Sequence, residues 1–226
     1  MKYIVHDGHE FVYFVVQKVA CSSIKTALRP LFDVENPARY ETIRKDGKRS
    51  FRVHKLFDES GYQIDGSKFF GRVEGEYRDY FKFAFVRNPW DRLVSCYFQK
   101  IVNPKGIDLN PPGEDRFYRS MQFGEFVEVV AAIPDEKANA HFRSQYRGIC
   151  DKNRNVLANF VGRFENLAED FDFVAKKIGD ERLELPHLLR SGRRRSRPYV
   201  EFYDDRLREL VRRRFRDDVE IFGYSF

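Results

Sequence analysis

The first apolar residues of the chain predict a hairpin, a buried strand and a helix. Residues 2–16, KYIVHDGHEFVYFVV, contain two β-rich runs on either side of an Asp-Gly turn signal. The second run, residues 11–16, is apolar on both faces, as expected of a strand inside a sheet. Ser22 and Ser23 are favourable helix N-cap residues, and the apolar side chains after them recur at helical spacing. The pattern therefore predicts a strand, a turn and a helix in succession.

A second strand and helix are predicted near the middle of the chain. The run FKFAFVR, residues 81–87, is typical of a buried strand. Asn88 and Pro89 suit the cap and the first position of a helix. The apolar residues from Trp90 to Ile101 then follow helical spacing, which predicts a strongly amphipathic helix.

Strands and helices alternate through the rest of the chain. Helices are predicted over residues 123–132, 138–146 and 166–178, a strand over 159–164, and a last helix around Leu207, Leu210, Val211 and Phe215. Residues 33–80 and 103–120 are polar and rich in glycine or proline, so we expect them to be irregular. The order predicts one α/β domain over residues 1–226, with a central parallel β-sheet flanked by helices and an N-terminal hairpin.

Composition excludes some classes of protein but does not identify a ligand. Hydrophobic residues make up 42% of the 226 residues and aromatic residues 16%, which excludes a disordered chain. The net charge of +6 favours anionic partners of any kind. Three cysteines without a CxxC pair indicate neither a disulfide framework nor a zinc site. The sequence shows no signal-like segment and no membrane-length apolar run, so we expect a cytosolic protein if the chain begins at its natural start.

The turn after the first buried strand is a candidate anion site. Lys18 lies at the end of that strand, and Cys21, Ser22, Ser23 and Lys25 follow it. Helix N-termini at the carboxyl ends of parallel strands attract anions. The Gly-x-x-x-x-Gly-Lys-Ser/Thr pattern of nucleoside triphosphate loops is absent, which argues against ATP. Because capped turns between a strand and a helix are common, the stretch read alone favours a capped helix and a solvated lysine.

A second candidate anion site follows the next strand. Arg87 ends that strand, and Ser95 lies on the helix after it. Asp91, Arg92 and Ser95 are predicted on the helix face away from the apolar stripe. We expect Arg87 and Ser95 to converge on one phosphate, because the guanidinium fork matches two phosphate oxygens.

These two stretches, QKVACSSIK and FVRNPWDRLVSCYFQK, resemble the two cofactor signatures of the carbohydrate sulfotransferases of the chondroitin and dermatan type. The later segments NAHFRSQYRGIC, NFVGRFENLAEDFDFV and EIFGY also resemble blocks of that family, so the resemblance covers nearly the whole chain. It implies a P-loop-like fold and an enzyme that transfers a sulfuryl group from 3′-phosphoadenosine-5′-phosphosulfate (PAPS) to a hydroxyl of a carbohydrate-type acceptor. It implies no resident metal.

The resemblance also implies roles for individual residues. The loop that holds the 5′-phosphosulfate would comprise Lys18, Ala20, Cys21, Ser22, Ser23 and Lys25, and the 3′-phosphate site would comprise Arg87 and Ser95. Lys18 would lie nearest to the transferred group. The chain departs from the family at Ser23-Ile24, where Asn-Trp is common, and at Asn88-Pro89-Trp90, where Glu-Pro-Phe is common.

Sulfuryl transfer also needs a base that removes the proton of the acceptor hydroxyl. Among the five histidines, we expect His54 to be that base, because a histidine at a comparable place serves the related heparan sulfate 2-O-sulfotransferases. His141 is the second candidate. His6 and His9 flank the predicted turn, which indicates surface roles, and His187 lies in a loop.

The basic segment LLRSGRRRSRPY, residues 188–199, admits three interpretations. Its position resembles that of a late cofactor lid, which would place Arg194 and Arg197 on the nucleotide. It also suits recognition of an acidic glycan, or a solvated run of charge. An ATP-dependent phosphotransferase and a basic glycan-binding or nucleic-acid-binding module are the rival functions. Nucleic acid is not expected, because the arginines at 212–214 lie between apolar positions of a helix and are followed by two aspartates, as on an ordinary solvated face. A lipid acceptor, and through it peripheral membrane association, stays open.

Overall fold

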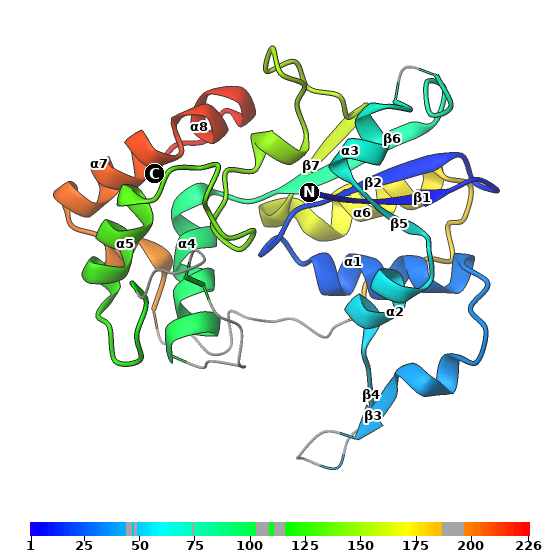
Figure 1. Cartoon of the computed structure of the whole chain (residues 1–226), viewed down its shortest axis with the longest axis horizontal. Coiled ribbons are helices and arrows are strands. Elements are labelled where there is room, and N and C mark those ends of the chain that lie inside the picture. The colour runs from blue at the N-terminus through cyan, green and yellow to red at the C-terminus, as the bar shows by residue number, and fades with distance from the viewer. Residues whose placement is uncertain (44–46, 48, 74, 103–108, 111–115, 187–196) are drawn as a thin grey trace.

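The computed structural model describes residues 1–43, 47, 49–73, 75–102, 109–110, 116–186 and 197–226. Its centre is a five-stranded sheet of order β5-β1-β2-β6-β7 (Figure 1). The strands are β1 (Lys2–His6), β2 (Phe11–Val15), β5 (Gln63–Asp65), β6 (Phe81–Val86) and β7 (Phe160–Arg163). β2, β6 and β7 are parallel, whereas β1 is antiparallel to both β2 and β5. The predicted parallel core and N-terminal hairpin are therefore confirmed, within a sheet that is mixed at one edge.

Burial explains the central position of β2 and β6. All five residues of β2 and five of the six residues of β6 are buried. The parallel register pairs Phe11 with Phe81 and Phe14 with Ala84, so both strands end at the same edge of the sheet. That edge brings the turns after the two strands together, as ligand sites in α/β sheets require.

Some helices cover the sheet, and others form a separate group at one end of it. They are α1 (Cys21–Leu28), α2 (Val53–Glu59), α3 (Gly66–Phe70), α4 (Pro89–Tyr97), α5 (Phe123–Ala132), α6 (Leu167–Lys177), α7 (Asp205–Arg214) and α8 (Arg216–Phe222). Shorter elements are the 3-10 turns η1 (Arg29–Leu31), η2 (Pro37–Tyr40), η4 (Tyr146–Gly148), η5 (Phe164–Asn166) and η8 (Tyr199–Phe202), the π turn η3 (Phe98–Val102) and a hairpin of β3 (Glu41–Ile43) with β4 (Arg49–Phe51). Figure 1 places α4, α5, α7 and α8 together beyond one end of the sheet.

Several predicted elements are confirmed. The strand over 159–164 is β7, the helices over 123–132 and 166–178 are α5 and α6, and Asn88 caps α4 by accepting the backbone N–H of Trp90 at 3.1 Å. The last predicted helix is two helices, α7 and α8, separated at Phe215.

Two local predictions are wrong. Residues 138–146 form turns rather than a helix, because side chains accept the backbone N–H groups that a helix would use. Asn139 Oδ1 accepts from His141 N, and Asp135 Oδ1 accepts from Ser144 N. The predicted serine cap is also wrong. Helix α1 follows Ala20 and begins at Cys21, so Ser22 and Ser23 lie inside its first turn.

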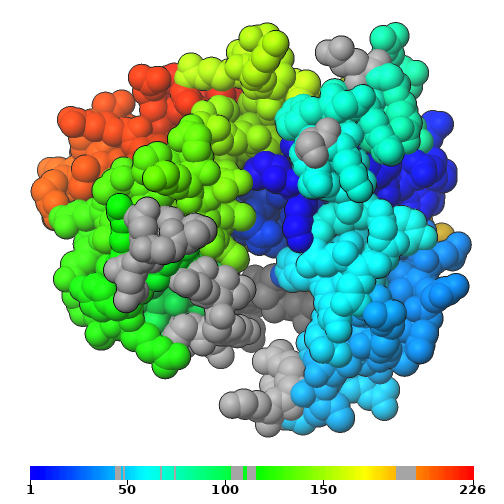
Figure 2. Space-filling model, viewed as in Figure 1, coloured from blue at the N-terminus to red at the C-terminus, as the bar shows by residue number. Residues whose placement is uncertain are grey.

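Among the residues that the structure describes, the buried apolar side chains form two hydrophobic clusters. The first contains β1, β2 and β6 with residues from α1, α2 and α6, and the second contains residues of α4, α5 and α7. Between segments coloured green and cyan, Figure 2 shows a hollow whose bottom is formed by blue residues from the start of the chain. Figure 1 draws the turn from β2 to α1 in the same region. Within the described residues, no helix has the length and apolar character needed to cross a membrane.

Candidate active site

The loop between β2 and α1, residues 16–20, has a backbone that ordinarily favours glycine. Lys18 has φ of 71° and Ala20 has φ of 63°, both in the left-handed region. Each such residue costs on the order of 1–3 kcal/mol and persists only where its surroundings hold it. The β2–α1 loop therefore makes a tight phosphate-loop-like turn without glycine.

Two arginines hold this loop. Arg87 Nη1 donates to the carbonyl of Lys18 at 3.1 Å, and Arg92 Nε donates to the carbonyl of Gln17 at 3.0 Å. Both arginines are buried. This corrects the expectation that Arg92 lies on the exposed face of its helix.

The start of α1 is suited to an anion. Ala20 offers no capping side chain, and the first turn contains no acidic residue, so nothing there neutralises the positive end of the helix dipole. Lys18 Nζ donates to Gln99 Oε1 at 2.9 Å, from the π turn that follows α4. Burial lowers the pKa of Lys18 to about 8. A positive charge and a helix N-terminus therefore meet at one place.

His54 lies against the first turn of α1. Helix α2, inside the segment expected to be irregular, brings His54 Nε2 to 2.7 Å from Ser22 Oγ. Burial, followed by the charge of Lys25, lowers the pKa of His54 to about 4, so the ring is neutral at neutral pH. Among smaller effects, Lys2 also lowers this pKa, whereas the Asp58 carboxylate raises it.

His141 occupies a more positive environment. Its Nδ1 lies 2.7 Å from Asn139 Oδ1, an oxygen that also accepts the backbone N–H of His141. Because an amide oxygen only accepts, Nδ1 carries the proton and Nε2 the lone pair. Burial, then the charges of Lys100, Lys18 and Arg92, lowers the pKa of His141 to about 3.

Three residues predicted to bind the nucleotide have side chains that are buried in the protein. Lys25 is 1% exposed and donates to Gln63 Oε1 at 2.7 Å. Ser23 is buried, and the buried Cys21 Sγ lies 3.5 Å from Gln17 Oε1. Their side chains support the helix and the loop. The backbone N–H of Ser23 donates to the carbonyl of Ala20 at 2.8 Å, and Lys25 lies beyond the first four N–H groups of α1. Cys21 is therefore the one of the three whose backbone N–H could meet an anion.

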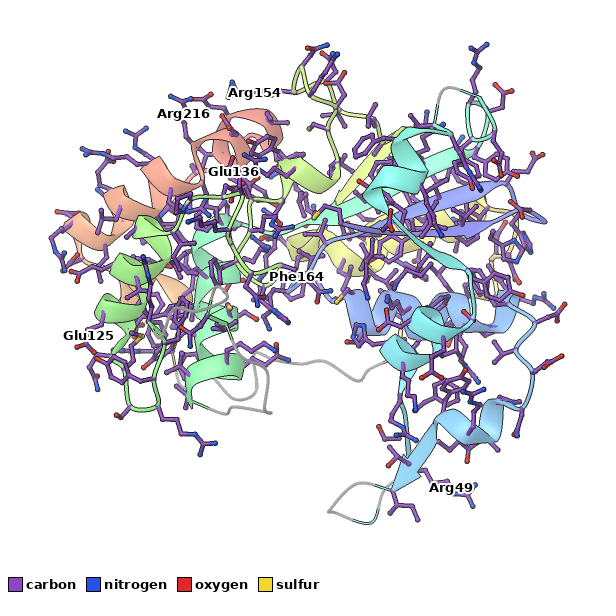
Figure 3. The ribbon with its side chains drawn as sticks, in the orientation of Figure 1. Arg49, Glu125, Glu136, Arg154, Phe164 and Arg216 are labelled. Atoms are coloured by element: carbon purple, nitrogen blue, oxygen red, sulfur yellow. The ribbon has the colours of Figure 1, made fainter. Side chains whose placement is uncertain are left out.

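The second predicted anion site is closed by an ion pair. Arg87 Nε and Nη2 lie 2.7 and 2.6 Å from Asp91 Oδ2, and the guanidinium stacks on the ring of Phe164 at 3.9 Å. Phe164 is labelled near the centre of the molecule in Figure 3. Ser95 lies on the same helix as Asp91 and is 8% exposed. A bidentate contact of a phosphate with Nε and Nη2 of Arg87 requires that the guanidinium exchange Asp91 for the ligand.

The basic segment and the three remaining histidines are described only in part. Arg197 is described, and its guanidinium stacks on Phe202 at 4.2 Å. Arg194, the rest of the basic segment before Arg197, and His187 lie outside the described residues. His6 and His9 are half-buried rather than at the surface, and each lies 2.7 Å from a backbone carbonyl, of Leu31 and Ile178 respectively.

Three amide side chains that hydrogen-bond the predicted site residues were not predicted from the sequence. Gln99 follows the amphipathic helix at a polar position, and Gln145 and Asn139 lie in a segment predicted to be helical. The motif NAHFRSQYRGIC contained the last two, but its resemblance pointed to His141 alone. Hydrogen-bonding amides leave no periodic signal, so their contacts become visible only in the folded chain.

The fold and the loop define the class of this protein, the P-loop-like α/β proteins. Within that class, the chain belongs to the sulfotransferase family, whose sequence model matches residues 1–225. It is 23% identical to carbohydrate sulfotransferase 11 of Danio rerio over 98% of this chain and 66% of that protein. It is 26% identical to carbohydrate sulfotransferase 14 of Homo sapiens over 77% of this chain and 46% of that protein. With carbohydrate sulfotransferase 12 of Mus musculus it shares 25% identity over 98% of this chain and 59% of that protein.

These comparisons confirm the family resemblance at a distance. The chain spans about half to two thirds of the length of the curated relatives it matches. No solved structure matches it. The comparisons lend no support to the cytosolic location expected from the sequence.

Proposed function

We propose that this protein transfers a sulfuryl group from PAPS to a hydroxyl of a carbohydrate. The observation that carries the proposal is the contact of Ser22 with His54, at 2.7 Å, in the first turn of the helix that follows the Lys18 loop. A cation, a helix N-terminus and a neutral imidazole then lie at the carboxyl edge of the sheet of a chain that belongs to the sulfotransferase family.

The residues of the β2–α1 loop fit the 5′ end of such a donor. PAPS, when bound, supplies the sulfuryl group and a phosphate leaving group that gains negative charge during transfer. Lys18 and the positive end of α1 would stabilise that charge. Arg87 and Ser95 would hold the 3′-phosphate after Arg87 releases Asp91. Arg194 and Arg197 stay candidates for the nucleotide, and an acidic acceptor is the alternative ligand for them.

His54 is the better placed of the two candidate bases. The carboxylate of Asp58 raises the pKa of His54 against the lowering by Lys25 and Lys2, whereas every principal charge that acts on His141 lowers its pKa. If His54 Nε2–H donates to Ser22 Oγ, the Nδ1 lone pair can accept the proton of the acceptor hydroxyl. The Ser22 hydroxyl then keeps its own proton for an oxygen of the donor.

Ligand-dependent thermal stability tests the nucleotide. Adenosine 3′,5′-bisphosphate, the product of transfer from PAPS, is expected to raise the melting temperature, and ATP at the same concentration is expected to leave it within about 1 °C. Lys18→Met should abolish the shift. Selective stabilisation by ATP would contradict the proposal. A screen of carbohydrate acceptors with sulfur-labelled PAPS then identifies the acceptor class.

Matched histidine variants test the base. His54→Gln is expected to lower kcat by about 100-fold or more, because general base catalysis contributes roughly that much, with an unchanged Kd for adenosine 3′,5′-bisphosphate. His141→Gln is expected to lower kcat less than tenfold. The opposite order would assign the base to His141.

A further inference from the structure

Asp218, in α8, carries a fully buried carboxylate behind the candidate site. Its exposed fraction is 0%, and its oxygens accept the backbone N–H groups of Gln145 and Tyr146, each at 2.9 Å. Gln145 Nε2 also lies 3.3 Å from Asp218 Oδ2. A buried carboxylate is expensive unless hydrogen bonds and opposite charge stabilise it, so these contacts define how Asp218 is held.

One connection from Asp218 to the β2–α1 loop passes through Gln145 and Arg87. The Gln145 side chain pairs with both backbone groups of Arg87, accepting from its N–H at 3.0 Å and donating to its carbonyl at 2.9 Å. Gln145 is 0% exposed, so this pairing fixes the end of β6 without water. From that position, Arg87 reaches the carbonyl of Lys18.

The other connection is electrostatic and passes through Arg92. Arg92 is 2% exposed, and Asp218 is the principal group of opposite charge that acts on it. Its guanidinium donates to the carbonyl of Gln17 at 3.0 Å and to that of Arg143 at 2.9 Å. Arg92 therefore joins the loop to the segment that contains Gln145 and His141.

Both connections end on consecutive carbonyls at the point where the backbone becomes left-handed. Gln17 and Lys18 accept from the two arginines, and Lys18 has φ of 71°. We propose that Asp218 is a positioning residue, which holds Gln145 by hydrogen bonds and balances the charge of Arg92, so that the β2–α1 loop keeps the conformation that presents Lys18. In this role Asp218 does not itself contact the sulfuryl donor or the carbohydrate acceptor. Its effect on ligand binding rests on the proposed function, whereas its effect on the loop does not.

Asp218→Asn tests this inference with Asp217→Asn as the matched control. Asparagine removes the charge that stabilises Arg92 and turns an NH2 group toward a backbone N–H donor. Asp217 is the neighbouring aspartate, which pairs instead with Arg154 near the surface. Hydrogen exchange is measured by mass spectrometry on the full chain without ligand, for a peptide covering residues 14–24 and for one covering α6. The Kd for adenosine 3′,5′-bisphosphate is measured in parallel.

In Asp218→Asn we expect at least tenfold faster exchange in residues 14–24, unchanged exchange in α6, and at least tenfold weaker nucleotide binding. Asp217→Asn should match the wild type in all three. Equal acceleration in the loop and α6, or no acceleration in the loop, overturns the proposal. If Asp218→Asn does not fold, Arg92→Lys is judged by the same criteria, because lysine lacks the guanidinium fork.

The double variant Asp218→Asn/Arg92→Lys, where it folds, separates a shared effect from two independent ones. If both residues act through the loop, it should bind nucleotide no more weakly than the worse single variant. Effects that multiply contradict the proposal. A wild-type protein that binds no nucleotide refutes the proposed function, and loop exchange alone then decides the role of Asp218.

Discussion

At the scale of single residues, the charge of Lys18 depends on pH in the range where enzymes are assayed. Burial lowers its pKa to about 8, whereas a bound phosphate favours the ammonium form and raises that pKa. Binding therefore takes up a proton once the pH exceeds about 8. We expect the Kd for adenosine 3′,5′-bisphosphate in wild type to rise roughly tenfold between pH 7.5 and 9.5, since each pH unit is worth up to about tenfold.

Arginine at this position removes the dependence. Lys18→Arg keeps its charge to above pH 12, so its Kd should be nearly constant over the same range, as measured by calorimetry. Lys25→Arg is the control and should keep the wild-type slope, because Lys25 is buried against Gln63. If the pH dependence of the Kd persists in Lys18→Arg and disappears in Lys25→Arg, the titrating group is Lys25, and the assignment to Lys18 is wrong.

The pair of Arg87 with Asp91 gives a second residue-scale prediction. If Arg87 must exchange Asp91 for the 3′-phosphate, the carboxylate competes with the ligand. Asp91→Asn should therefore lower the Kd for adenosine 3′,5′-bisphosphate severalfold, with no change for adenosine 5′-monophosphate, which lacks the 3′-phosphate. Equal changes for both nucleotides would show that Asp91 does not compete at the 3′ site.

The sequence predicts where the site residues lie in the fold better than it predicts which side chains they contact. The ends of two buried strands located Lys18 and Arg87 at one edge of the sheet, because parallel strands share that edge. The pairing of Arg87 with Asp91 could not be read in this way, since a helical spacing of four residues permits the contact without requiring it. His54 was chosen from family resemblance, and its contact with Ser22 depends on a fold over intervening loops.

At the scale of elements, long apolar patterns were reliable and short elements were not. Helices α4, α5 and α6 each present an apolar face to a hydrophobic cluster. Helix α2 has only seven residues in a polar region, so its three buried side chains, Val53, Leu56 and Phe57, gave too short a pattern. The prediction of a helix over 138–146 was wrong although its apolar pattern was long enough. The side chains of Asp135 and Asn139 accept hydrogen bonds from backbone N–H groups of this segment.

The start of α1 stores backbone strain, and one pair of variants measures it. Ala20→Gly should relieve the left-handed conformation and raise the free energy of unfolding by up to about 1 kcal/mol, because the relief exceeds the entropy that glycine adds to the unfolded chain. Ala27→Gly, in the last turn of the same helix, should lower it by about 1 kcal/mol or more, because Ala27 is also buried in the first hydrophobic cluster. Denaturant unfolding measures both. A loss of stability in Ala20→Gly would mean that the side chain, rather than the strain, dominates at this position.

At the scale of the whole molecule, the loop joins two hydrophobic clusters. Lys18 and Ala20 belong to the turn that follows the sheet, whereas Arg92 and Gln99 come from α4 and the turn after it, beside the second cluster. The carbonyl of Gln17 and the Nζ of Lys18 are bound from that side, whereas the carbonyl of Lys18 is bound by Arg87 at the end of β6. A site assembled in this way depends on the relative placement of both clusters, which no local sequence pattern specifies.

The two buried histidines make the stability of the whole chain sensitive to acid. Burial lowers the pKa of His54 to about 4 and that of His141 to about 3, from 6.5 for an unperturbed histidine. Between pH 6.5 and 4 the unfolded chain therefore binds more protons than the folded chain, so stability is present above pH 6.5 and decreases as the pH falls through this window. Asp218 acts in the opposite direction, since burial raises its pKa to about 6 from 3.8.

A comparison of variants isolates the histidine contribution, because Asp218 and the other carboxylates are common to both proteins. The free energy of unfolding of the wild type, measured in urea at intervals from pH 7 to 4, should decrease more steeply than that of His54→Asn/His141→Asn. The difference in slope should approach one proton for each histidine near pH 5. Parallel curves would mean that both imidazoles titrate normally in the folded protein. Neither would then be buried as a neutral base, and the assignment of His54 to the acceptor proton would lose its electrostatic support.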